Sequence, residues 1–311
     1  MTGGAGFIGS HLVHALVDRG DGVAVIDDLS TGSASRLEPI MARIRFVEGD
    51  IRDPDAMERA AKGCDAILHE AAIPSVARSL RDPQATNSVG TDGTIQVVLA
   101  AGRAGCRRVV IASSSSVYGA SPELPRHEGQ VPDPRSPYAA SKLAAEAYLH
   151  SMGPLLGVET VALRYFNIFG PDQDPASEYA AVVPRFITAA LRGDGVSIHG
   201  DGLQTRDFTE VENVVAANLL ALDAPGADGL TCNIGCGSRF TLLDLVAAIE
   251  SAVGRPLRVE HTEARAGDVR DSQAAIHLAE ERLGYRVVVP FEAGIERAVE
   301  WYAARETALD A

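Results

Sequence analysis

The 311-residue chain has few cysteines, few lysines and little positive charge. Four cysteines are too few for a disulfide scaffold, so we expect reduced thiols and a cytoplasmic location. The formal net charge of −14 argues against a nucleic-acid partner, because such a partner requires a basic face. Only Lys62 and Lys142 of the 28 basic residues are lysines. Because the chain uses arginine elsewhere, a lysine at one of these positions suggests that an ammonium group is required there.

Long hydrophobic runs are also missing. No stretch approaches the roughly 18 apolar residues of a membrane span, and no basic segment leads into an apolar one, so we expect neither a membrane anchor nor a signal peptide. Cys232 and Cys236 have no second pair nearby, so we expect no zinc site and no other metal. The composition, 46% apolar and 23% charged, is that of an ordinary globular enzyme.

Short β-branched runs alternate with helical patterns in the first half of the chain. The runs predict buried strands at Val23–Asp27, Ile44–Glu48, Ala66–His69, Arg108–Ala112 and Glu159–Arg164. The intervening patterns predict helices at Gly6–Arg19, Pro54–Ala61, Pro83–Arg103 and Pro137–Met152. Such alternation with short turns indicates right-handed βαβ units and a parallel sheet.

A glycine-rich turn stands at the start of the first predicted helix. Gly4-Ala5-Gly6-Phe7-Ile8-Gly9 fits G-x-G-x-x-G, and Gly3 adds a further glycine. These glycines permit a tight turn and let backbone N–H groups approach a pyrophosphate. Asp27 ends a predicted strand 18 residues after Gly9. A carboxylate there binds the adenosine ribose hydroxyls and repels a 2′-phosphate, which favours NAD over NADP.

The pattern predicts an α/β fold, with a Rossmann-type doubly wound parallel sheet and a smaller C-terminal substrate-binding lobe. After Asn167 the regular alternation of strands and helices ends. The sequence there predicts a loop at 170–175, a strand at Val196–His199, and helices near Val182–Arg192, Glu210–Leu222, Thr241–Val253 and Glu292–Ala304. We expect residues 1–166 to form the NAD-binding domain, with about 210–235 packing back on it. Residues 167–209 and 236–311 would form the lobe.

Only Met1 and Thr2 precede the glycine turn, whereas a doubly wound sheet requires a strand there. We therefore expect a misassigned start or a truncation. A native mass that matches residues 1–311 would contradict this expectation.

A serine cluster and a Tyr–Lys pair carry the candidate chemistry. Ser113-Ser114-Ser115-Ser116 follows a predicted strand, at the end where ligands bind in parallel sheets. Tyr138 and Lys142 are four residues apart and share one face of a predicted helix. A nearby ammonium lowers the pKa of a phenol, which makes Tyr138 a usable base.

In combination, the motifs resemble the extended NAD-dependent epimerase/dehydratase family of the short-chain dehydrogenases/reductases. The resemblance runs from Thr2 to about Tyr302 and includes His69-Glu70-Ala71-Ala72, Asn87 and Arg164-Tyr165-Phe166-Asn167. It implies that Tyr138 is the general base, that Lys142 positions the nicotinamide ribose and tunes Tyr138, and that Ser114 bonds the reacting hydroxyl. Besides Tyr138 and Lys142, it implies cofactor contacts at Gly3, Gly6, Phe7, Ile8, Asp27, Asp28, Asp50, Ile51, Ala71, Ala72, Asn87 and Tyr165.

The resemblance also narrows the reaction. Dehydratases of the family carry Asp-Glu after the catalytic Ser/Thr, and UDP-glucuronate decarboxylases keep a Glu, whereas this chain has Ser115-Ser116. Uronate 4-epimerases carry Thr where Asn167 stands and Arg where Asp174 stands. The resemblance therefore implies 4-epimerisation of a neutral UDP-hexose through a transient 4-keto sugar.

The substrate residues follow from the same resemblance. Arg206 and Arg265, and less directly Arg270, match segments that hold the UDP diphosphate, and a guanidinium suits phosphate oxygens. Ser272 stands where a bulky Tyr would exclude an N-acetyl group, which favours UDP-GlcNAc/UDP-GalNAc, alone or beside UDP-Glc/UDP-Gal. The remaining implied contacts are Ser115, Ser116, Asn167, Ala181, Val182, Phe186 and Ser197.

The sequence is also compatible with other functions. Within enzymes they are a UDP-glucuronate 4-epimerase or a sugar-nucleotide dehydratase, and in another class a non-catalytic NAD-sensing regulator. The helices at Pro83–Arg103 and Pro137–Met152 have apolar faces that suit either core burial or a homodimer, as in dimeric relatives.

Overall fold

The structure is a computed structural model that describes residues 1–175, 181–263 and 269–309. One parallel sheet organises the larger part. Strands β3 (Ala66–His69), β4 (Arg108–Ser114), β5 (Glu159–Tyr165) and β10 (Leu230–Ile234) lie side by side in that order. Strand β1 (Val23–Asp27) pairs in parallel with β2 (Ile44–Glu48).

Met1 and Thr2 lie between these two groups of strands. Thr2 forms parallel bridges with Ile26 of β1 and with His69 of β3. The amino group of Met1 donates a hydrogen bond to the Ala24 carbonyl oxygen at 2.7 Å. The two groups of strands thereby form a single layer.

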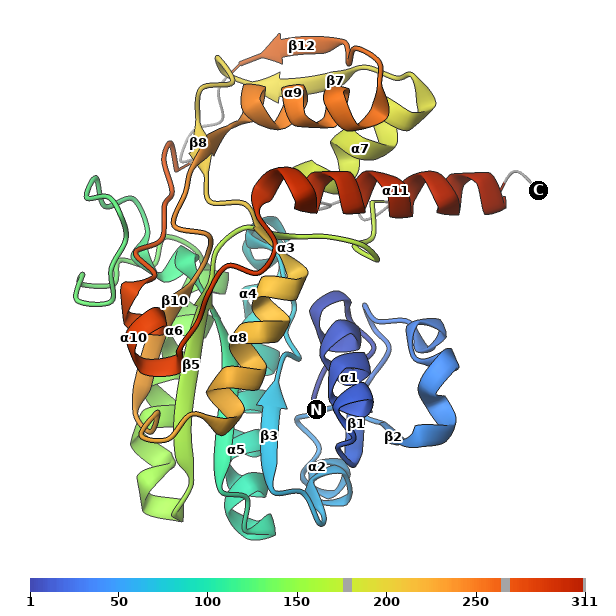
Figure 1. Ribbon diagram of the computed structural model, residues 1–311. Helices are drawn as coiled ribbons and strands as arrows, with labels where there is room; N and C mark the ends of the chain where they lie inside the picture. The colour runs from blue at the N-terminus through green and yellow to red at the C-terminus, as the bar shows by residue number, and fades with distance from the viewer. Residues whose placement is uncertain (176–180, 264–268, 310–311) are drawn as a thin grey trace.

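Helices cover both faces of this layer (Figure 1). On one face, α1 (Phe7–Arg19), α8 (Val211–Asp223) and α10 (His277–Leu283) enclose a core with Val25, Leu163 and other strand residues. On the other, α2 (Pro54–Ala61), α5 (Gly93–Ala104) and α6 (Pro137–Met152) enclose a second core. Helices on both faces of a parallel sheet confirm the predicted doubly wound fold.

A smaller lobe sits at one end of the sheet layer, the end toward which β3 points (Figure 1). It has its own core, built around Phe186, Phe208, Phe291 and neighbouring aliphatic residues. Its main elements are α7 (Val182–Arg192), β7 (Val196–His199), α9 (Leu242–Val253), β12 (Val259–Thr262) and α11 (Phe291–Leu309). Within the range expected for this lobe, α10 packs instead against the sheet core, through Ala279 and Leu283.

Short strands connect the two parts. Strand β6 (Ile168–Phe169) pairs with β9 (Thr209–Glu210), and β8 (Thr205–Arg206) pairs with β11 (Phe240–Thr241). Buried Asp207 lies between β8 and β9 and accepts hydrogen bonds from the backbone N–H groups of Cys236, Gly237 and Ala274. This carboxylate fixes the path of the chain where the small lobe leaves the sheet.

The long helix predicted at Pro83–Arg103 is interrupted. The structure has α4 (Pro83–Asn87), a π-helical turn (Ser88–Asp92) and then α5. Gly90, inside the π turn, touches α6 so closely that a Cβ there would lie 2.9 Å from Ser141 Oγ. Close packing against α6 therefore accompanies the break, and helical periodicity does not reveal it. Before α4 lies the short helix α3 (Val76–Arg81), which the sequence interpretation missed.

Candidate active site

The glycine turn leads from the sheet into the N-terminus of α1. Gly3 has φ of 65°, and a Cβ on it would lie 2.6 Å from the backbone nitrogen of Ala71. A Cβ on Gly9 would lie 2.0 Å from the Gly3 oxygen. Both positions therefore require glycine. Gly6 caps α1 without a side-chain hydrogen bond, which leaves the N–H groups of the first turn, at Phe7 and Ile8, suited to an anion.

Asp27 and Asp28 lie beside this turn at the end of β1. Buried Asp27 accepts hydrogen bonds from the N–H of Ala5 at 2.8 Å and of Leu29 at 2.9 Å. Burial raises the pKa of its carboxyl group, and these two bonds oppose the rise. Asp28 is exposed and accepts a bond from the Ser30 hydroxyl. Asp27 thus also holds the glycine turn in place, a role the sequence did not reveal.

The other predicted cofactor residues surround the same edge of the sheet. Ala71 and Ala72 follow β3 and are half-buried, and Asn87 ends α4 and is exposed. Asp50 forms an ion pair with Arg52, which lowers the pKa of the Asp50 carboxyl group, and buried Ile51 packs against Gly93.

Ser114 is the last residue of β4. Its Oγ accepts hydrogen bonds from the backbone N–H of Ser116 at 3.1 Å and from the Ser116 hydroxyl at 2.9 Å. The Ser114 side chain also lies close enough to Tyr138 to lower the pKa of its phenol, against the larger effect of burial. The structure therefore brings Ser114, Ser116 and Tyr138 near one another. Ser116 donates its hydroxyl hydrogen bond to Ser114, whereas the sequence predicted a contact of Ser116 with the substrate.

Lys142 reaches the sheet from α6 and is buried. Its Nζ donates a 2.6 Å hydrogen bond to the carbonyl oxygen of Ala112 on β4 and lies 6.0 Å from the centre of the Tyr138 ring. Burial lowers the pKa of Lys142 to about 8. Burial also raises the pKa of Tyr138, and the nearby Ser114 side chain opposes this. The net direction of the Tyr138 pKa is thus upward, not the lowering expected from the ammonium.

A buried polar network lies behind these residues. Ser113 donates to Glu146 of α6, and Arg164 of β5 forms a bidentate ion pair with the same carboxylate at 2.9 and 2.7 Å. Arg164 also donates to the hydroxyl of Tyr118 at 3.0 Å. Each partner of this buried pair is hydrogen-bonded, which fixes α6 against β4 and β5 and so fixes Lys142 relative to Ser114.

Sequence reasoning missed the environment of Glu70. The hydroxyl of Tyr165, the last residue of β5, donates a 2.6 Å hydrogen bond to Glu70 Oε1. Buried Asn218 of α8 donates a 2.7 Å bond to that hydroxyl. Tyr165 is therefore bound by two protein groups at the end of β5. The acidic residue directly after a buried strand was a signal, but its partners are far apart in the sequence.

The predicted substrate residues gather at the junction of the lobes. Arg206 lies on β8 and donates to the carbonyl oxygen of Arg270 at 3.1 Å. Exposed Arg270 forms a 2.8 Å ion pair with Asp201. Ser272 is buried, and its N–H donates to the Thr205 oxygen at 3.2 Å. The structure thus brings Arg206, Arg270 and Ser272 together, while Arg265 lies outside the described residues.

The remaining predicted substrate residues differ in exposure. Asn167 and Ser197 are exposed, Ala181 caps α7 and is exposed, and Val182 and Ser115 are half-buried. Phe186 is 2% exposed and belongs to the core of the small lobe. Its side chain packs inward because it stands on the apolar face of α7, so we correct its direct side-chain contact to a supporting position beneath the site.

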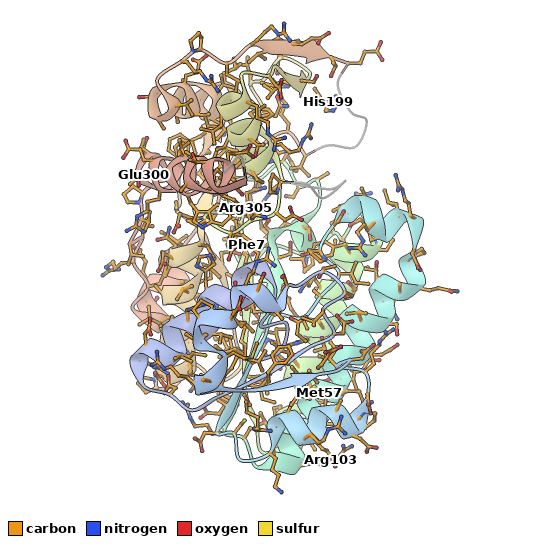
Figure 2. All side chains as sticks on the ribbon, turned by 90° about the vertical axis from the view of Figure 1, so that its right-hand side faces the viewer. Phe7, Met57, Arg103, His199, Glu300 and Arg305 are labelled. Carbon is orange, nitrogen blue, oxygen red and sulfur yellow. The ribbon has the colours of Figure 1, made fainter. Side chains whose placement is uncertain are left out.

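The arrangement fits a dinucleotide. An uncapped helix N-terminus, a turn that admits only glycine, and Asp27 and Asp28 at the next strand end match pyrophosphate and ribose groups. The glycine turn and Tyr138 lie at the same edge of the sheet. Phe7 lies at the level where the two lobes meet, far from Met57 and Arg103 (Figure 2). Across residues 1–175, 181–263 and 269–309, no three His, Cys, Asp or Glu side chains gather to hold a metal.

No helix in the described part of the chain is long and apolar enough to cross a membrane. The four cysteines are free thiols.

Comparison with known proteins gives the same picture. The chain is similar to the UDP-glucose 4-epimerase of Mycolicibacterium smegmatis, with 40% identity over 306 residues that cover 97% of both chains. Its fold matches the UDP-N-acetylglucosamine 4-epimerase from Methanobrevibacter ruminantium, with a TM-score of 0.93, 36% identity, and 98% and 97% of the two chains covered.

A Thermus thermophilus UDP-glucose 4-epimerase solved in complex with NAD has a TM-score of 0.88 and 35% identity, with 97% of both chains covered. The model of the NAD dependent epimerase/dehydratase family matches residues 1–235. The chain belongs to the NAD-dependent epimerase/dehydratase family.

Proposed function

We propose that this protein is a UDP-hexose 4-epimerase that uses NAD. The observation that carries the proposal is the cluster of Ser114, Tyr138 and Lys142 beside a dinucleotide-binding turn, with hydroxyl groups alone at positions 115 and 116. Elimination of water needs an additional acid and base, and Ser115 and Ser116 supply neither at neutral pH. Epimerisation needs one base and a hydride acceptor. The similarity to 4-epimerases over nearly the whole chain supports the same activity.

Each of the three residues has a separate role in the proposed reaction. NAD supplies a reversible hydride acceptor when bound. Tyr138 takes the proton of the sugar 4-hydroxyl, and the Ser114 hydroxyl bonds the same oxygen and orients it. Lys142 holds a positive charge beneath the site, which stabilises the phenolate of Tyr138. After the 4-keto sugar has turned its other face to the site, Tyr138 returns the proton, so the net oxidation state is unchanged.

We propose further that the substrate is a UDP-N-acetylhexosamine, alone or beside UDP-glucose and UDP-galactose. Ser272 is small and lies beside β8, next to Arg206 and Arg270. Both guanidinium groups suit the oxygens of a diphosphate. Asp174, which is exposed, would repel the carboxylate of a uronate.

We also propose a cytoplasmic homodimer. The outer face of α6 is formed by Ala140, Ala147 and Tyr148, the last 43% exposed, and these small and aromatic side chains suit packing against a second copy. Sedimentation analysis of the protein and of a Tyr148→Glu variant tests this. A monomeric wild type, or a dimer unchanged by the substitution, would contradict it.

One experiment tests the activity. The purified protein is incubated with NAD and, separately, with UDP-Glc, UDP-GlcNAc and UDP-GlcA, and NMR identifies the products. We expect UDP-Gal or UDP-GalNAc and no product from UDP-GlcA. A 4-keto-6-deoxy sugar would indicate a dehydratase, and galacturonate a uronate epimerase. No turnover of any sugar, with NAD bound, would indicate a cofactor-sensing regulator.

A further inference from the structure

Glu70 lies directly beneath the glycine turn. Its backbone N–H donates to the Thr2 oxygen at 3.3 Å, and a Cβ on Gly3 would lie 3.0 Å from the Glu70 carbonyl carbon. Next to it, Ala71 is packed against Gly3 itself. The residue thus lies against the glycine turn, whose geometry suits the pyrophosphate of a dinucleotide.

The Glu70 side chain is hydrogen-bonded to a residue of β5, which in turn contacts α8. Tyr165 donates to Oε1 at 2.6 Å, Asn218 donates to Tyr165, and Asn218 is itself bonded to the Val214 oxygen at 2.9 Å. Among the described residues, Oε2 has no hydrogen-bonding partner. One carboxylate oxygen is therefore fixed by Tyr165, and the other keeps its capacity to accept a hydrogen bond.

The sheet register places this carboxylate next to the catalytic groups. His69 pairs with Ile111 across β3 and β4, so Glu70 is level with Ala112, whose carbonyl oxygen accepts the Lys142 bond. Neighbouring strands lie about 4.8 Å apart. Burial lowers the pKa of Lys142, and the negative charge of Glu70 opposes this lowering; burial raises the pKa of Tyr138, and Glu70 adds to that rise.

A charge at this position would change the relative affinities of the site for the oxidised and the reduced cofactor. The oxidised nicotinamide ring is positively charged, whereas the reduced ring is neutral, so a carboxylate in the groove attracts only the oxidised form. Lys142 opposes the oxidised form with its own positive charge. In a buried site such interactions are stronger than in water.

We propose that Glu70 is a positioning residue whose carboxylate offsets the charge of Lys142 and makes the site bind NAD⁺ in preference to NADH. The reacting sugar would then spend little time as the 4-keto form, because that form exists only while the cofactor is reduced. The second consequence rests on the proposed epimerase function, and the first does not.

Other titratable groups face the same region, and the effects of their charges must be distinguished from the effect of Glu70. They are Tyr165 of β5, Tyr138 and Lys142 of α6, His69 of β3 and the amino group of Met1. Burial lowers the pKa of His69 to about 3, so this ring stays neutral above pH 5. Burial lowers the pKa of the Met1 amine to about 6 and raises that of Glu70 to about 7. The Met1 amine therefore changes charge near pH 6 and Glu70 near pH 7, whereas Lys142, whose pKa burial lowers to about 8, stays mostly charged up to pH 7.5.

The test measures cofactor affinities and needs no sugar. The dissociation constants of NAD⁺ and NADH are determined by calorimetry on nucleotide-free protein at pH 6.0 and 7.5, for wild type, Glu70→Gln and Glu70→Asp. The upper pH stays below the pKa of Lys142, so that Lys142 keeps most of its charge. In the wild type we expect the preference for NAD⁺ to grow several-fold between these pH values, as Glu70 loses its proton. Glu70→Gln should show a smaller preference that depends less on pH, and Glu70→Asp should restore most of the dependence.

A second readout uses absorbance at 340 nm after addition of UDP-glucose, where Glu70→Gln should accumulate several-fold more bound NADH than the wild type. A preference that does not change with pH in the wild type, or that changes equally in Glu70→Gln, would overturn the proposal. The wild-type series alone decides the first case, even if the variant does not fold. Protein that prefers NAD⁺ as described but epimerises no sugar would contradict the proposed function and leave this inference standing.

Discussion

The two parts of the protein hold their functional residues in different ways. In the sheet layer, Lys142 is 7% exposed, is bonded to the sheet backbone and lies against the ion pair of Glu146 and Arg164. In the junction with the small lobe, the Arg270 side chain is 61% exposed, and β8 has only two residues. The residue proposed to tune the catalytic base is therefore held in a desolvated core, whereas Arg270, proposed for substrate binding, is a surface group that can exchange partners. Changes in the first part should abolish function, and changes in the second should adjust it.

The largest effect is expected at Tyr138. Tyr138→Phe removes the group that moves the proton but keeps the ring and its packing, so kcat should fall by roughly a thousandfold. Turnover of UDP-glucose and the NAD⁺ dissociation constant are both measured. Unchanged cofactor affinity would show that the loss is chemical, and substantial remaining turnover would refute the role of Tyr138.

A smaller effect, on stability, is expected where the two parts meet. Glu210 is 1% exposed, and burial raises its pKa from 4.5 to about 7. A carboxyl group with a raised pKa in the folded state stabilises the fold below pH 4.5, and this contribution is lost as the pH rises through 7. Wild-type stability should thus fall between pH 5.5 and 8.

Glu210→Gln keeps an acceptor for the Glu212 N–H and removes the charge, so it should raise stability at pH 8 by about 3 kcal/mol. Denaturant unfolding at both pH values checks this. Equal pH dependence in the two proteins would place its origin elsewhere, for example at buried Asp207, whose pKa burial raises to about 6.

A substitution at Ser272 should change substrate specificity, with a smaller effect on turnover than Tyr138→Phe. Ser272→Tyr fills the space beside β8, so turnover of UDP-GlcNAc should fall at least about tenfold, while turnover of UDP-glucose is retained. Ser272→Ala is the matched control and should alter neither. Unchanged rates on UDP-GlcNAc would refute the gate. Equal losses on both sugars would mean that a change at the junction also disturbs the catalytic residues of the sheet layer.

The smallest effect is expected at Arg270. Arg270→Ala should raise KM a few-fold and leave kcat unchanged, because solvent screens an exposed guanidinium and weakens its attraction for a bound anion. Arg286, a similarly exposed arginine paired with Glu280, provides the control variant Arg286→Ala. A fall in kcat with constant KM would show that Arg270 acts in the chemical step and would weaken the contrast between the two parts.

Much of the fold was predictable because it depends on local patterns. The predicted strands Val23–Asp27, Ile44–Glu48 and Ala66–His69 and the helices Pro54–Ala61 and Pro137–Met152 match the structure residue for residue. Strand β10 was missed because its run, Leu230–Ile234, alternates with Thr231 and Asn233 and has no strong apolar pattern. Strand β12 was missed because most of its side chains are exposed.

By itself the sequence determined the identities of the reactive groups and their order along the chain, since glycine turns and the Tyr–Lys spacing are local. Tertiary structure decided their properties. Burial lowers the pKa of Lys142 and raises that of Tyr138, against the expectation from the ammonium alone. It also brought Glu70 to Tyr165 and Asn218, which lie 95 and 148 positions later in the sequence. Solvent exclusion and long-range contacts arise only when the sheet assembles, so no local pattern can encode them.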